Sequence, residues 1–237
     1  MTQWIKSSKW CALLIAVALT PFAPSQASAQ IGIAGEVVSS YVWRGFELDD
    51  GVNVQPDIWF DAGNLSFGAW SSWALDGDAS EIDFYVSLYQ ELSFGELNLS
   101  LTDYFYPSAE GEFDDIGNFD GDGDGAHTLE LGVEFTPTAV PLTVMVGWNA
   151  HNDPDKALYG QLSTDQSLGD FADLHVESGL LLKDSENYYG GELGDLTHFG
   201  VSLTRYFSLG AIEPYFSAGF VRSEIEDSNY WIFAFGF

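Results

Sequence analysis

Acidic side chains recur at alternate positions along several apolar segments of this chain. Around Asp57, Asp83 and Glu130, polar residues alternate with aliphatic and aromatic ones. This period of two is typical of β-strands, in which the polar side chains share one face. In a sheet that closes on itself, carboxylates on the inner face form acidic rings that attract cations. The charged residues that we expect on the inner face are Glu36, Arg44, Asp57, Asp83, Glu130, Glu134, Glu177, Glu213 and Arg222.

Residues 114–125 concentrate the hard oxygen ligands that Ca²⁺ prefers. Asp120, Asp122 and Asp124 match the first half of an EF-hand loop. The bidentate acid that completes such a loop would fall at Leu131, which excludes a full EF-hand. Two interpretations remain open: a weak calcium site made by the three aspartates, or a solvated acidic loop without a metal. No other cofactor is expected.

The four histidines are the candidates for acid–base chemistry. His127 and His151 fall near the expected external ends of strands, and His175 and His198 fall on expected inner positions. None of them belongs to a recognisable nucleophile motif with a serine. We therefore expect that the protein is not an enzyme.

The last residues of the chain, 229–237, form the clearest predicted strand, and no charge interrupts it. The aromatic residues that share one of its faces are Trp231, Phe233, Phe235 and Phe237. A soluble protein would rarely leave such a strand at a free edge, where it invites aggregation. In a transmembrane barrel, lipid covers the aromatic face, and the first strand, which we expect near Val37 to Trp43, pairs with the edge. The four aromatics also resemble the assembly signal of bacterial outer-membrane barrels, which is read by the barrel assembly machinery.

Residues 1–29 have the features of a secretory signal peptide: Lys6 and Lys9 precede a short apolar run, and small residues allow cleavage after Ala29. The remaining residues, 30–237, form one predicted barrel domain. The signal peptide takes with it Cys11, the only cysteine, and two of the seven basic residues but no acid. The formal net charge therefore moves from −29 to −31. Such a charge repels nucleic acid, which we exclude as a partner.

Connectors between the predicted strands alternate between short turns and longer or more polar segments. With the signal peptide and the aromatic end, this alternation favours an all-β, antiparallel transmembrane β-barrel over a soluble sandwich. The spacing predicts about twelve strands, and ten or fourteen also fit the pattern. After the signal peptide no run of about 18 apolar residues occurs, which excludes helical membrane spans.

Arg44 is a rare basic residue among 36 acidic ones. Alternation places Tyr41 and Trp43 on the opposite face, so we expect these aromatics at the outer membrane interface and Arg44 in the lumen near the external rim. Arg44 could select solutes or anchor a loop, or it could form a structural ion pair with a carboxylate such as Asp57. In the second case, Arg44, Lys183 and Arg222 could together neutralise the inner acids and close the barrel.

Four segments carry a family resemblance: Ser39-Ser-Tyr-Val-Trp-Arg-Gly45, Gln55-Pro56, Gly68-Ala-Trp-Ser-Ser72 and Glu81-Ile-Asp-Phe-Tyr85. Across residues 31–107 the chain resembles the TorF-type porins, a group of bacterial outer-membrane proteins. The resemblance implies a porin-like barrel and does not settle the solute.

The expected function is a channel in the bacterial outer membrane for passive diffusion of small solutes, with a weak preference for cations from its acidic lumen. The alternative is a closed barrel whose acidic external loops bind cations, mediate adhesion or serve a structural role. The expected partners are outer-membrane lipids, the barrel assembly machinery and small solutes, and the oligomeric state is left open.

Overall fold

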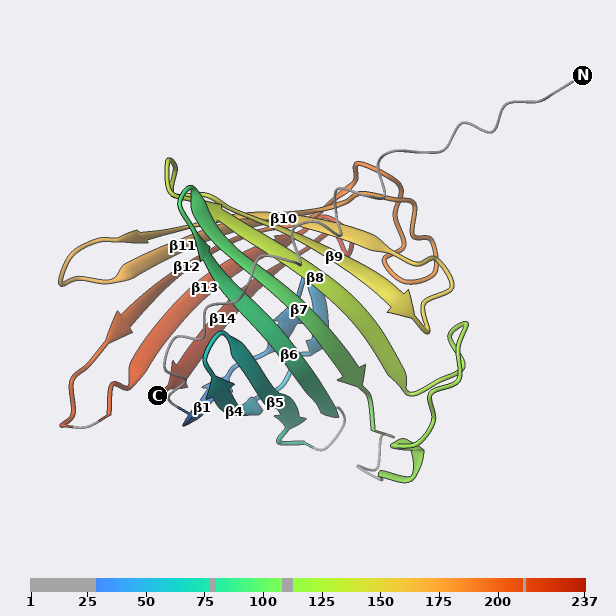
Figure 1. The fold of residues 1–237 in the computed structure, drawn as a ribbon, viewed down its shortest axis with the longest axis horizontal. Coiled ribbons are helices and arrows are strands. Elements are labelled where there is room, and N and C mark those ends of the chain that lie inside the picture. Colours follow the sequence, from blue (N-terminus) through green and yellow to red (C-terminus); the bar gives the residue numbers. More distant parts are fainter. Residues whose placement is uncertain (1–28, 77–79, 108–112, 211) are drawn as a thin grey trace, which may run out of the picture.

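A computed structural model describes residues 29–76, 80–107, 113–210 and 212–237 (Figure 1). The predicted signal peptide lies outside the described residues except for Ala29, where the first strand begins. No helix in these ranges is long and apolar enough to cross a membrane.

In the described part of the chain, twelve strands form one closed antiparallel barrel. Its strands are β1 (Ala29–Val38), β4 (Asn53–Ala62), β5 (Leu65–Ala74), β6 (Ser80–Leu92), β7 (Gly95–Phe105), β8 (His127–Pro137), β9 (Thr143–His151), β10 (Leu158–Ser167), β11 (Asp173–Leu181), β12 (Leu196–Tyr206), β13 (Tyr215–Ser223) and β14 (Ser228–Gly236). Each barrel strand pairs with the barrel strands before and after it in the chain, and β4 follows β1 because β2 and β3 form a separate sheet. β1 also pairs with β14, and this pairing closes the ring. The all-β fold and the strand number predicted from the sequence are confirmed.

The barrel turns its apolar face outward. On β8, Leu131 and Val133 are 43% and 46% exposed, whereas Glu130, on the opposite, inner face of the strand, is 6% exposed. The same alternation leaves Ile31, Ile33, Phe60 and Phe67 exposed on β1, β4 and β5, and it leaves the aromatics of β14 exposed as well. The core is therefore not apolar: the interior is filled mainly by polar and aromatic side chains, and the outer surface is the oily one.

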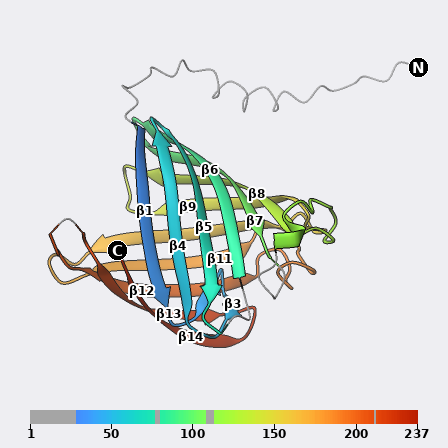
Figure 2. The same cartoon turned by 90° about the horizontal axis from the view of Figure 1, so that it is seen from below.

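The ring closes over a short stretch. β1 pairs with β4 along its whole length, as the two neighbouring blue and cyan strands in Figure 2 show, but it meets β14 only from Glu36 to Val38. Val37 lies opposite Phe235, as the sequence predicted for the first and last strands. The first wall strand ends at Val38, however, whereas the prediction continued it to Trp43. That part of the prediction is wrong.

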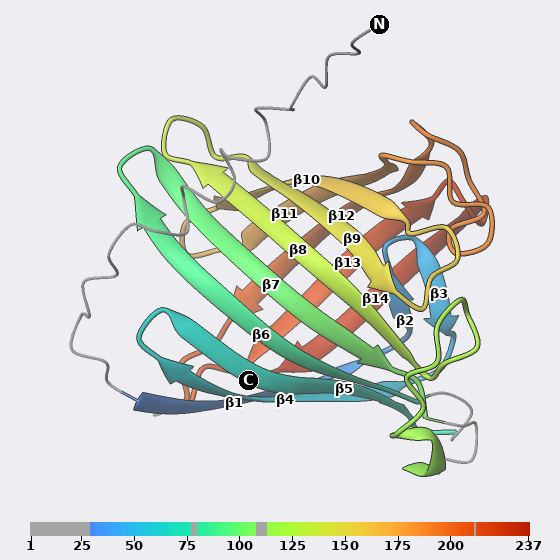
Figure 3. The same ribbon diagram turned by 45° about the vertical axis from the view of Figure 1, so that its right-hand side comes forward.

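Residues 41–49 leave the wall and form a separate hairpin of β2 (Tyr41–Trp43) and β3 (Phe46–Asp49). Figure 3 shows this hairpin inside the ring, at the end of the barrel that carries the longer connections. Its turn has two residues, Arg44 with φ 51° and Gly45 with φ 96°. Two successive positive φ angles give a turn whose twist matches that of the two strands. A Cβ atom on Gly45 would lie 2.8 Å from the Thr197 carbonyl oxygen, so the turn needs glycine there.

Candidate functional site

Arg44, at the tip of the hairpin, is bound on every side. Its Nη1 and Nη2 donate to the two carboxylate oxygens of Glu130 at 2.6 and 2.8 Å, and Nη1 also donates to the Tyr189 hydroxyl at 2.9 Å. The guanidinium carbon lies 4.5 Å from the ring centre of Trp43 and 4.1 Å from that of Tyr159. The Arg44 and Glu130 side chains are 8% and 7% exposed. A fork-to-fork ion pair between aromatic rings anchors the hairpin tip to the barrel wall.

The wall is shaped to receive this pair. Glu130 lies on the inner face of β8 and accepts a further hydrogen bond from the Tyr104 hydroxyl on β7. Gly147, its neighbour on β9, leaves the space, because a Cβ atom there would lie 2.5 Å from a Glu130 oxygen. Tyr189 comes from the β11–β12 connection and stacks on Tyr159 of β10. We call this wall of β7 to β10, together with Tyr189, the Arg44 side of the lumen.

The prediction placed Arg44 in the lumen, and the structure places it there. Its ion-pair partner is Glu130, however, rather than Asp57, which instead accepts a hydrogen bond from the Tyr85 hydroxyl. Sequence alone did not indicate this partner, because Glu130 lies 86 residues away. Burial raises the pKa of Tyr189 to about 12, so the phenol beside the arginine stays neutral.

The two aromatics beside Arg44 are not at the membrane interface, and that prediction is wrong. The Tyr41 hydroxyl donates to Glu81 at 2.9 Å, and its ring packs against Trp70. Trp43 packs against the Tyr104 ring with the centres 5.7 Å apart. The reason is the bend at residues 39–40, which turns the chain into the barrel, so the alternation of β1 does not extend to the hairpin.

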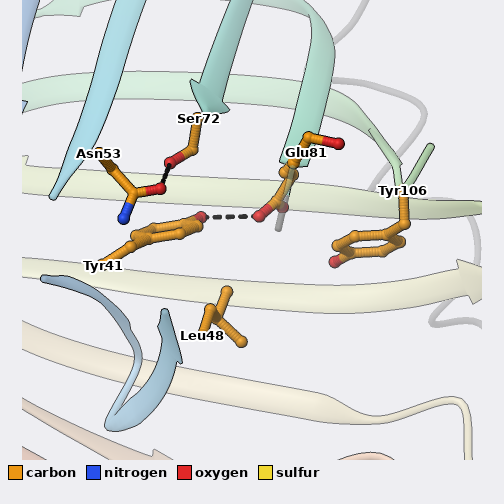
Figure 4. A pocket seen from close by; sticks show the side chains of 7 residues that line it. Tyr41, Leu48, Asn53, Ser72, Glu81 and Tyr106 are labelled. Atoms are coloured by element: carbon orange, nitrogen blue, oxygen red, sulfur yellow. Dashed lines mark hydrogen bonds between the residues drawn. The ribbon is translucent and has the colours of Figure 1, made fainter. Parts of the chain in front are cut away.

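A small cavity of about 150 Å³ lies between the hairpin and the wall of β4 to β6 (Figure 4). Tyr41 and Glu81 meet across it, and Ser72 donates to Asn53 at its edge. Next to Glu81 on the same face, the Asp83 Oδ1 atom is buried and has no hydrogen-bond partner among the described residues. Glu81 was missing from the predicted inner acids, although its position two residues before Asp83 gives it the same face.

A larger cavity of about 360 Å³ lies on the other side of the hairpin, against β1, β4 and β12 to β14. We call it the Glu36 side of the lumen. Glu36 accepts a hydrogen bond from the Tyr215 hydroxyl at 2.8 Å. No Lys, Arg or His side chain in the described ranges forms an ion pair with Glu36.

Glu177 on β11 lies between two histidines. His198 Nε2 is 3.3 Å from one carboxylate oxygen, and His175 Nε2 is 3.5 Å from the other. His175 also contacts Asp165 at 2.8 Å. The hydroxyl of Thr197 is 3.0 Å from His198 Nδ1, but Thr197 is fully buried, so it is not accessible to a substrate.

Two of the predicted inner charges lie elsewhere. Arg222 shares the outward face of β13 with Phe216 and Phe220, and it pairs with Glu224 and Asp227 near the end of the strand. The prediction that Arg222 lines the lumen is therefore corrected. Glu213 is also corrected: it lies in the exposed connection before Tyr215, where β13 begins. Lys183 donates to the Asp155 carbonyl in the loops and does not reach the inner acids.

The acidic loop is held by a neighbouring asparagine. Asn152 Oδ1 accepts from the backbone amides of Gly123 and Gly125, and its Nδ2 donates to the Gly125 carbonyl. Among the described residues, which include Asp120, Asp122 and Asp124, no three His, Cys, Asp or Glu side chains are grouped as metal ligands. Calcium binding by this loop stays a prediction.

Another external connection contributes to the Arg44 side. The Asp155 carboxylate accepts hydrogen bonds from the Asn187 side chain and from the amides of Asn187 and Tyr188. Slight burial raises the pKa of Asp155, but these bonds outweigh it and hold the pKa below its usual value. Asp155 thereby positions the loop that carries Tyr189.

No family model and no curated protein sequence matches the chain. Among solved structures, the chain is similar to one described as KdgM porin, with a TM-score of 0.54 and 10% identical residues. The match covers 88% of this chain and 96% of that one. At this identity the likeness concerns the fold alone. The porin-like barrel fold implied by the family resemblance is confirmed, and the narrower likeness to TorF-type porins stays a prediction.

Proposed function

We propose that the protein is an outer-membrane channel through which small solutes diffuse passively. The observation that carries the proposal is the inverted polarity of the closed barrel. Apolar side chains such as Ile31 and Phe233, which are 68% and 48% exposed, face outward, while Glu36, Asp57 and Glu130 face inward. A closed barrel satisfies every backbone hydrogen bond within the wall, which is the condition for crossing lipid with strands.

The inner hairpin is the constriction of this channel. Its tip is fixed to the Arg44 side, and the cavity of about 360 Å³ leaves space on the Glu36 side. A path beside a fixed obstacle admits small solutes and excludes large ones.

A weak preference for cations follows from the charges. Glu130 neutralises Arg44, while Glu36, Asp57 and Glu134 have no basic partner among the described residues. The fixed charge that a permeating ion meets is therefore negative.

Reversal potentials in a planar bilayer under a KCl gradient test both parts of the proposal. We expect steady ohmic steps and a potential of the sign that indicates a higher permeability for K⁺ than for Cl⁻. A preference for Cl⁻ would overturn the cation preference. A barrel that inserts but carries no current would overturn the channel.

One observation favours a second candidate, a closed barrel with a binding or structural role: the anchored hairpin occupies part of the lumen. Electrical silence would support it. Calorimetry at millimolar calcium tests its cation-binding form, in which Asp120, Asp122 and Asp124 would supply ligands. No heat of binding would count against that form.

We further propose that the barrel resides in the bacterial outer membrane after cleavage behind Ala29. Lipid would cover the outward face, and the barrel assembly machinery would read Trp231, Phe233, Phe235 and Phe237, which are exposed at the closing strand. Sequencing the amino terminus of the membrane-bound protein tests this: we expect Gln30 first. An uncleaved or soluble product would contradict it.

A further inference from the structure

The cavity on the Glu36 side has a wall of mixed character. Among the described residues that line it, Glu36 is the one that carries a charge. Two tyrosines, Tyr206 and Tyr215, also line the cavity, and their ring centres lie 5.6 Å apart with the ring planes inclined by 54°. Apolar side chains such as Val38 and Ile232 cover another part of the wall. A volume of about 360 Å³ is enough for a small organic molecule.

The hydrogen-bond donors of this wall are largely committed to the protein. The Tyr215 hydroxyl donates to Glu36, and the Thr204 hydroxyl donates to Ser217. Gln55 donates to Ser72 outside the cavity. An anion or a sugar needs several donors from its site, and this wall has few to offer. The carboxylate of Glu36, with one hydrogen bond and no basic partner in the described ranges, remains as an acceptor.

The remaining groups fit an organic cation. A single carboxylate is too few oxygen ligands for Ca²⁺ or Mg²⁺, which take six or more. An ammonium group on a small apolar body would meet the Glu36 carboxylate, the faces of the tyrosine rings and the aliphatic wall together.

We propose that this cavity is a binding site for small organic ammonium ions, and that it selects them as permeating solutes. The second half of the proposal rests on the proposed channel function, and the first half does not. Glu36 provides the charge, Tyr206 and Tyr215 provide aromatic faces, and the hairpin forms the opposite wall. The surroundings of Arg44 provide no such site, because Arg44 already neutralises Glu130.

The chain offers a matched control for Glu36. Asp57 is also an inner carboxylate that accepts a hydrogen bond from a tyrosine hydroxyl, that of Tyr85, but it does not line the cavity. Glu36→Gln and Asp57→Asn each remove one negative charge from the lumen. Only the first removes it from the proposed site.

The test is a calorimetric titration of the detergent-solubilised barrel with choline chloride, using KCl and glucose as comparison titrants. We expect choline to bind and glucose not to bind. Glu36→Gln should weaken choline binding by at least about tenfold, as expected for loss of a charge partner. Asp57→Asn should change it by less than about twofold. Tyr206→Leu, which keeps the charge and removes a ring, should weaken it by about threefold.

Equal choline binding by the wild type and a folded Glu36→Gln barrel would overturn the site, as would equal losses in the Glu36→Gln and Asp57→Asn variants. If Glu36→Gln does not fold, unchanged binding by Tyr206→Leu would overturn it instead. Block of the K⁺ current by choline then tests permeation separately. A barrel that binds choline without conducting would refute the channel and leave the binding site standing.

Discussion

The two sides of the inner hairpin hold the same pair of groups in different settings. On both sides a wall carboxylate accepts a hydrogen bond from a tyrosine hydroxyl, Glu130 from Tyr104 and Glu36 from Tyr215. Glu130 also binds the buried guanidinium of Arg44, whereas Glu36 lies beside the larger cavity. A carboxylate with its own arginine holds the fold together, and one without an arginine is available to a mobile cation. The Arg44–Glu130 pair therefore distinguishes the side of the lumen that holds the hairpin from the side that carries the proposed cation site.

Glu130→Gln should have the largest effect, because it leaves Arg44 charged and buried without a carboxylate. Removing one partner of a buried ion pair costs about 3–5 kcal/mol, enough to release the hairpin from the wall. We expect a lower unfolding free energy of the barrel and larger, noisier single-channel currents. Glu134→Gln is the control, because it removes an inner acid of the same strand that has no basic partner in the described part of the chain. Identical currents in the two variants would contradict the proposed difference between the Arg44 side and the Glu36 side of the lumen.

Gly45→Ala should have the next largest effect. It places a Cβ atom 2.8 Å from the Thr197 carbonyl oxygen at a residue with φ 96°, so steric conflict adds to backbone strain. We expect a loss of about 2–3 kcal/mol in unfolding free energy. Gly169→Ala separates the two causes. Gly169 has φ 67°, but beyond its two chain neighbours no described residue has an atom within 4 Å of the added Cβ, so this variant should lose only about 1 kcal/mol. Equal losses would show that the close approach of the turn to Thr197 is unimportant.

Acid should weaken the Arg44 side by a smaller amount, through the loop that carries Tyr189. The folded pKa of Asp155 lies below its unfolded value of about 3.8. Its hydrogen bonds therefore stabilise the loop fully above that pH, and this stabilisation is lost as the pH falls through the lower, folded value. Current noise should rise in that window in the wild type. In Asp155→Asn the current noise should already be high at neutral pH and should not rise further in acid. A full rise of the noise in acid in that variant would contradict the role of Asp155.

The barrel wall was predictable because the alternation of polar and apolar residues that specifies each strand lies within that strand. Even in β10 and β11, where alternation is weak, pairing with strong neighbours completes the wall. The closure of the last strand against Val37 followed from the free aromatic edge at the end of the chain.

The hairpin was not predictable, because a period of two does not say which sheet a strand joins. Tyr41 and Trp43 alternate as well in a wall strand as in an inner hairpin, and the Arg44–Gly45 turn lacks the usual Asn-Gly or Asp-Gly signal. The partner of Arg44 lies far away in sequence and becomes its neighbour only when the ring closes. Arg222 was assigned to the wrong face, although its position two residues after Phe220 in one uninterrupted strand gives it the same, outward face.

Cysteine accessibility tests the division of the lumen most directly, because the predicted mature chain has no cysteine of its own. Ser217→Cys places a thiol in the cavity of the Glu36 side, and Thr128→Cys places one on the Arg44 side, two residues before Glu130. A cationic thiol reagent is added while single channels are recorded. It should rapidly reduce the current of the Ser217→Cys variant and leave the current of the Thr128→Cys variant unchanged. Modification at 128 as fast as at 217, or at 128 alone, would contradict a lumen that is closed on the Arg44 side and open beside Glu36.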